Sequence, residues 1–126
     1  MTKQGPVSGV LSVDKLTLGE LTVAEQTFAE VDKVSGLGVG YTIGAFDGIL
    51  GVAWDSIAVD GVTTPITNLY NAGELTKREF AFFLGDMADG ELVVGGVDKD
   101  HYTGTFTYVP LISETLWEVM LVFLFL

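Results

Sequence analysis

The sequence holds few residues of the kinds that carry enzymatic chemistry. It has no cysteine and a single histidine, His101, in a His-Tyr-Thr-Gly turn. A metal centre needs several converging ligands, so one histidine without a partner cysteine or clustered carboxylates predicts no metal site. Asp98 and Asp100 flank Lys99 in a pattern typical of a solvated loop rather than a calcium loop. We therefore expect His101 to be a surface turn residue and the chain to hold no metal.

Nucleophile and cofactor motifs give no stronger signal. Ser8, Ser12 and Ser56 have no histidine at a suggestive spacing, and Gly-x-Ser-x-Gly does not occur. The glycine-rich residues 35–40 lack the helix and the full pattern of a dinucleotide site, which indicates a flexible loop. We expect no cofactor.

The composition limits the possible partners. The 126 residues suffice for one domain, and 48% of them are apolar, enough to bury a core. A net charge of −11 repels phosphate, which disfavours nucleic acids and anionic membranes as partners. The same charge fits either an ordinary acidic surface or a protein that works at low pH. The apolar C-terminus, residues 119–126, is too short to span a bilayer as a helix.

Most of the elements that we expect are short strands. Apolar runs on both sides of Gly19 and Glu20 predict a hairpin. Residues 46–54 form an apolar run broken by glycines, a strand pattern that often marks the close approach of another backbone. Further apolar segments predict a buried run at 80–84 and strands at 91–96 and 105–109.

One segment predicts a helix. Thr64 can cap it, Pro65 suits its first position and Gly73 can end it. The class is mostly β with one or two short helices, and no linker divides the chain.

Three segments, residues 7–12, 46–51 and 90–98 with the turn at 101–104, together resemble the pepsin and cathepsin D family of aspartic endopeptidases. Residues 46–51, Phe-Asp-Gly-Ile-Leu-Gly, match a hallmark of the amino-terminal lobe in that family. Residues 90–98, with the turn at 101–104, are similar to the segment that joins the two lobes. Residues 7–12 resemble the strand that returns from the flap hairpin. In order and spacing, the resemblance covers roughly residues 5–120.

The resemblance implies a partial pepsin-like acid protease fold. The chain would form one partial domain, residues 1–126, made of the end of the amino-terminal lobe and the inter-lobe strands. The intact family enzymes hydrolyse peptide bonds in peptide or protein substrates without a metal. By family, the expected location is lysosomal or vacuolar, or outside the cell.

The family's catalytic motif is missing from these residues. Two Asp-Thr-Gly or Asp-Ser-Gly loops hold the paired carboxylates of such an enzyme, and neither string occurs here. We therefore assign no catalytic residue, and we expect the chain alone to hydrolyse no peptide.

Other site residues follow from the resemblance only. Ile49 matches a position that lines the pocket beside the scissile bond, and Tyr41 could line the same pocket. Ile49, Leu50 and Gly51 also match the segment that braces the first catalytic loop from behind. Gly5 matches a glycine of the flap.

The two ends depart from the family pattern. Thr2 stands where the flap tyrosine would be, and the apolar tail at 121–126 does not resemble the family. We expect a gene-model or transcript truncation, with self-association of a chain expressed alone. Two alternatives stay open: an inactive relative that acts as a peptide- or protein-binding β module, and a small unrelated all-β protein.

Overall fold

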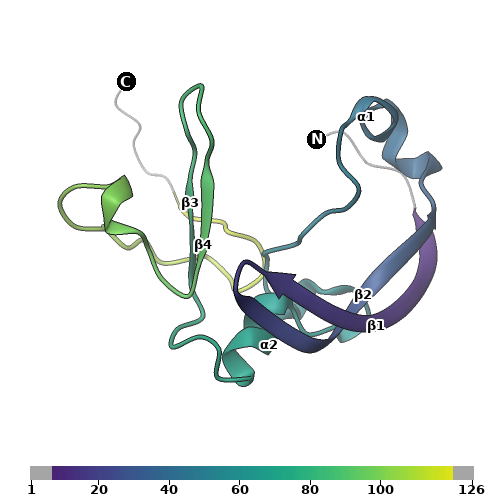
Figure 1. The fold of residues 1–126 in the computed structure, drawn as a ribbon, viewed down its shortest axis with the longest axis horizontal. Coiled ribbons are helices and arrows are strands. Elements are labelled where there is room, and N and C mark those ends of the chain that lie inside the picture. The colour runs from purple at the N-terminus through teal and green to yellow at the C-terminus, as the bar shows by residue number, and fades with distance from the viewer. Residues whose placement is uncertain (1–6, 121–126) are drawn as a thin grey trace.

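The computed structural model describes residues 7–120, so Gly5 and the tail at 121–126 lie outside it. Two separate antiparallel pairs make up its sheets: β1 (Ser8–Leu18) with β2 (Leu21–Lys33), and β3 (Phe80–Phe83) with β4 (Glu91–Val94) (Figure 1). The α-helices are α1 (Gly38–Ile43) and α2 (Pro65–Asn71). Single 3-10 turns are η1 (Ser35–Leu37), η2 (Asp55–Ile57), η3 (Val59–Gly61) and η4 (Lys99–His101). The predicted class, mostly β with one or two short helices, is confirmed.

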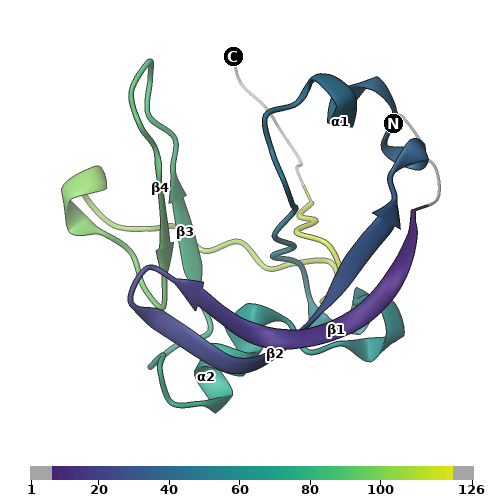
Figure 2. The same ribbon diagram turned by 45° about the vertical axis from the view of Figure 1, so that its right-hand side comes forward.

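The predicted hairpin is the longest element of the fold. Its two-residue turn pairs Leu18 with Leu21, and Gly19 takes φ +59°, a conformation that glycine adopts without strain. The register shifts between Asp14 and Leu16, where Lys15 alone lies opposite Ala24 and Glu25, so β2 carries the extra residue of a β-bulge. In both views the hairpin is bowed, and α2 lies below it (Figures 1 and 2).

Helix α2 begins and ends where the sequence predicts. Pro65 is its first residue, and Gly73 follows its end with φ +80°. The N–H of Gly73 donates to the carbonyl of Tyr70 (3.1 Å), and that of Glu74 donates to Leu69 (3.0 Å). These two bonds form a Schellman motif, which satisfies carbonyls at the end of the helix. The predicted cap by the Thr64 side chain is wrong, because its hydroxyl bonds Thr67 Oγ1 (3.1 Å) instead.

Three expectations about local structure are wrong. Residues 35–40 form η1 and the start of α1 rather than a flexible loop. Residues 46–54 contain no strand, and a Cβ added at Gly48 or Gly51 would meet no atom within 4 Å, so no backbone packs closely there. Residues 105–109 also form no strand, since none of the described segments pairs with them.

The buried core is small. Val23, Leu69 and Leu75 are its buried hydrophobic residues, and parts of the long hairpin, α2 and β4 pack around them. The accessible surface is 10430 Å², whereas a compact monomer of this mass exposes about 6,500 Å². The predicted buried run at 80–84 is wrong in this structure: Phe82 is 57% exposed and Leu84 is 84% exposed. Many large apolar side chains therefore stay exposed to solvent within residues 7–120.

None of the helices in the described part of the chain has the length and apolar character that crossing a membrane requires.

Candidate functional site

A concave pocket of ≈ 660 Å³ lies between the long hairpin and residues 49–65. One wall comes from both hairpin strands, among them Leu16, Leu18 and Phe28. The opposite wall comes from the extended segment at 49–54 and from the turns that lead into α2. The volume falls within the usual range for sites that hold a small molecule or a side chain.

Three of the site residues expected from sequence line this pocket. Ile49, Leu50 and Gly51 all border it, and the Ile49 side chain is 72% exposed. Tyr41 lies in α1, where its ring packs edge-on against Phe46 with centroids 5.5 Å apart. Tyr41 is not among the described residues that line the pocket. The structure thus brings the segment at 49–51 to the hairpin and leaves Tyr41 elsewhere.

Gln26 holds the pocket together, and the sequence analysis did not single it out. It is only 3% exposed. Its Nε2 donates to the carbonyls of Thr27 (2.8 Å) and Thr63 (3.0 Å), and its Oε1 accepts from Asn68 Nδ2 (2.9 Å). All polar atoms of the buried amide are therefore used, and β2 is joined to the loop before α2 and to α2 itself. The sequence gives little signal for this residue, because in a regular strand Gln26 would face the side opposite to Val23. The bulge at residues 24–25 turns both side chains to the buried face.

Asp55 fixes the entry to α2. Its Oδ1 accepts the backbone N–H of Thr64 at 2.9 Å. Burial opposes ionisation of this carboxyl, but hydrogen bonds from Thr64 and Thr67, together with the charge of Arg78, outweigh burial and lower its pKa. The carboxylate therefore keeps its charge, and its hold on the start of the helix, in more acidic solution than an ordinary aspartate would.

Two tryptophans connect the back of the pocket to the C-terminal segment. Trp54 lines the pocket, and its ring centroid lies 5.6 Å from that of Trp117. The indole N–H of Trp117 donates to the carbonyl of Val52 at 2.9 Å. Residues 52–54 are thus held by packing and by a hydrogen bond, although they belong to no strand.

The side chains that line the pocket are of the kinds that bind a ligand rather than those that transfer protons. Asp14 and Lys15 are its only charged members among the described residues, and the remaining side chains are mostly apolar. Within residues 7–120, no pair of carboxylates meets in the pocket to act as an acid and a base. The pocket suits an apolar side chain.

The family of this chain is settled by comparison with known proteins. A sequence profile described as "Eukaryotic aspartyl protease" matches residues 3–123, nearly the whole chain and the first three residues of the apolar tail. The chain belongs to the eukaryotic aspartyl protease family.

Individual aspartyl proteases agree with this assignment. Vacuolar protease A of Neurospora crassa is 41% identical over 116 residues, which cover 91% of this chain and 29% of that protein. Cathepsin D of Dictyostelium discoideum is 39% identical, with 93% of this chain and 31% of that protein covered. Cathepsin D of Clupea harengus is 38% identical, with 91% and 30% covered. The chain therefore spans less than a third of the length of these relatives, and the predicted resemblance to a portion of a pepsin-like protease is confirmed.

Proposed function

We propose that this segment forms one wall of the substrate cleft of an aspartic endopeptidase and braces its catalytic loop. The observation that carries the proposal is the position of Ile49, Leu50 and Gly51. These residues belong to the Phe-Asp-Gly-Ile-Leu-Gly run of the aspartyl protease family, and they line an apolar pocket of ≈ 660 Å³. Such a surface can take up an apolar side chain of a peptide substrate.

In this proposal the chain positions the substrate and the chemistry comes from elsewhere. Hydrolysis by an aspartate dyad requires two close carboxylates that share one proton, one acting as base towards water and the other as acid. The 126 residues contain no Asp-Thr-Gly or Asp-Ser-Gly. The catalytic pair therefore belongs to parts of the enzyme outside this segment.

The proposed compartment is an acidic one, vacuolar or lysosomal, with secretion as the second possibility that the family allows. Two observations support it. The relatives include proteins named vacuolar protease A, and the pKa of Asp55 is lowered. A carboxylate that stays charged in acid keeps its structural hydrogen bond to Thr64 under those conditions.

A chimera tests the proposed role. Residues 7–120 would replace the aligned segment of the Neurospora crassa vacuolar protease A, and peptide hydrolysis would be measured at low pH. We expect turnover that a transition-state peptide inhibitor abolishes.

Within the chimera, Ile49→Ala should lower kcat/KM roughly tenfold for substrates with a large apolar residue beside the scissile bond. Ile43→Ala is the matched control, because Ile43 is 78% exposed, close to the 72% of Ile49, and does not line the pocket. Equal effects of the two substitutions would contradict the proposed role of Ile49.

A second function draws on the edges of the strands. Within the described residues, each sheet has only two strands, so every strand leaves one edge unpaired. Such an edge can bind an extended peptide by main-chain hydrogen bonds. A chain that bound peptides tightly by itself, while the chimera stayed inactive, would favour this alternative of a peptide-binding β module.

A further inference from the structure

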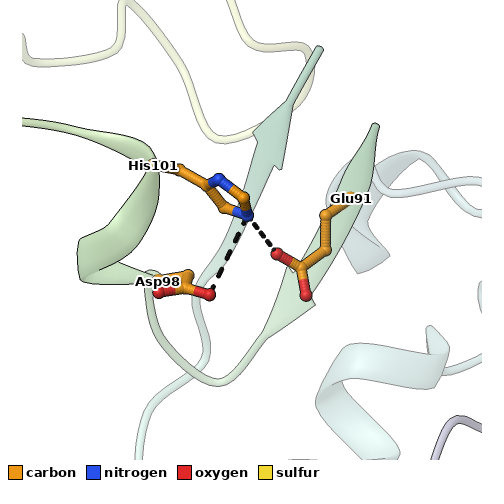
Figure 3. Close-up of side chains that lie close together, drawn as sticks. All are labelled: Glu91, Asp98 and His101. Atoms are coloured by element: carbon orange, nitrogen blue, oxygen red, sulfur yellow. Dashed lines mark hydrogen bonds and ion pairs between the residues drawn. The ribbon is translucent and has the colours of Figure 1, made fainter. Parts of the chain in front are cut away.

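Three side chains that can bind metal converge beside β4. Glu91 begins β4, Asp98 precedes η4 and His101 ends it (Figure 3). The Nε2 atom of His101 lies 2.6 Å from Glu91 Oε2 and 3.8 Å from Asp98 Oδ2. One donor atom from each residue lies within 4.8 Å of the other two. The sequence predicts no metal site at His101 on the premise that no carboxylates cluster with it, and the structure contradicts that premise.

Neighbouring groups hold two of these side chains in place. The other carboxylate oxygen of Asp98, Oδ1, accepts the backbone N–H of Asp100 at 2.8 Å, which leaves Oδ2 directed towards the imidazole. The ring of Phe83 stacks on that of His101 with centroids 3.9 Å apart and planes 9° from parallel. Outer contacts of this kind orient the ligands of protein metal sites.

We propose that Glu91, Asp98 and His101 bind a divalent transition-metal ion, of which zinc fits best. Zinc accepts imidazole nitrogen and carboxylate oxygen at about 2.0–2.2 Å, which in a tetrahedron places the ligand atoms roughly 3.3 Å apart. The distances from His101 Nε2 to Glu91 Oε2 (2.6 Å) and to Asp98 Oδ2 (3.8 Å) lie below and above that value. The side chains of Glu91 and Asp98 are 48% and 39% exposed, so they can rotate into place.

The donor set also selects among metals. Calcium and magnesium favour six or more oxygen ligands, whereas one nitrogen and two carboxylates suit zinc with a water in the fourth position. Two carboxylates offset the double charge of the ion, and the net charge of −11 on the chain attracts cations. The bound ion would join β4 to the turn at residues 98–101. None of the three residues lines the 660 Å³ pocket, so this site is independent of the proposed cleft wall.

The single histidine of the chain makes the test direct. Nuclear magnetic resonance of the imidazole gives one set of ring signals, which all belong to His101. Zinc chloride added at neutral pH should shift the Nε2 resonance of His101, and competition with a zinc-binding dye should give one zinc per chain. Magnesium chloride at the same concentration should leave the ring signals in place.

Substitutions distinguish specific zinc binding at these three residues from general attraction of zinc to an acidic surface. Glu91→Gln and His101→Ala should each weaken zinc binding at least tenfold. Asp100→Asn is the matched control, since it removes a neighbouring negative charge without removing a ligand, and it should bind zinc as the unmodified chain does. Asp98→Asn serves as a second variant if circular dichroism shows that Glu91→Gln loses the fold. The proposal is overturned if zinc leaves Nε2 unshifted, or if Asp100→Asn weakens binding as much as the ligand substitutions.

Discussion

The side-chain amide of Asn68 donates to Oε1 of Gln26 at 2.9 Å, and this bond joins α2 to β2 across 42 residues of sequence. The same Gln26 side chain reaches the carbonyl of Thr63, so the hairpin, the loop and the helix meet at one buried amide. This arrangement fixes one wall of the pocket relative to the other. In a chain with so small a core, buried polar contacts of this kind specify the fold.

Replacing Gln26 should therefore loosen the pocket. Gln26→Ala removes the short bonds to the Asn68 amide and the Thr63 carbonyl and leaves these two groups only their long contact with each other, 3.5 Å. This loss should lower the free energy of unfolding by about 1–3 kcal/mol. The urea midpoint of the chimera with vacuolar protease A measures this change. Glu25→Ala, on the exposed neighbour, is the control and should change the midpoint little. A Gln26→Ala chimera as stable as the parent would show that the amide network is dispensable.

Asp55 should stabilise the folded segment in mild acid, because its carboxyl group has a lower pKa in the folded state than in the unfolded state. The folded pKa lies below the ordinary aspartate value of about 3.9, so the stabilisation is complete above that value and is lost as the pH falls through the folded pKa. Asp55→Asn should remove this part of the pH dependence below about pH 5. Urea midpoints of the chimera across that range test this. Asp60→Asn removes the same charge from an exposed side chain on the next turn, so the difference between the two variants isolates the contribution of the hydrogen-bonded Asp55.

Local signals predicted well where the chain satisfies its own hydrogen bonds. The turn at Gly19 and Glu20 and the limits of α2 depend on neighbouring residues, and both were predicted from sequence. The runs at 46–54 and 105–109 have the composition of strands but no partner strand within residues 7–120. Because strand formation depends on a pairing partner, the local pattern could not predict that these runs form no strand. Tyr41 and the cluster at His101 depend on contacts that the spacing of residues did not reveal.

The end of α2 gives a test of the backbone itself. Gly73 has φ +80°, a region where a Cβ costs roughly 1–2 kcal/mol. Gly73→Ala should destabilise the chimera by that amount, as read from its urea midpoint. Gly40→Ala is the matched control, because an added Cβ there meets no atom within 4 Å, φ is not positive and Gly40 lies in α1, away from the pocket. Equal midpoints for the two variants would argue against the Schellman motif.

The exposed apolar surface predicts that the isolated chain associates with itself. Sedimentation velocity at neutral pH should detect species larger than 13.5 kDa, because apolar side chains such as Phe82 and Leu84 stay largely exposed in the described chain. A monomeric sample with a sharp, cooperative thermal transition would contradict this expectation.

We expect this aspartyl protease segment to shape a cleft without carrying the catalytic pair. Peptide hydrolysis at low pH tests this most directly, measured in parallel for the isolated chain and for the chimera with vacuolar protease A. We predict no turnover above buffer for the chain and inhibitor-sensitive turnover for the chimera. Inhibitor-sensitive hydrolysis by the isolated 126-residue chain would contradict it.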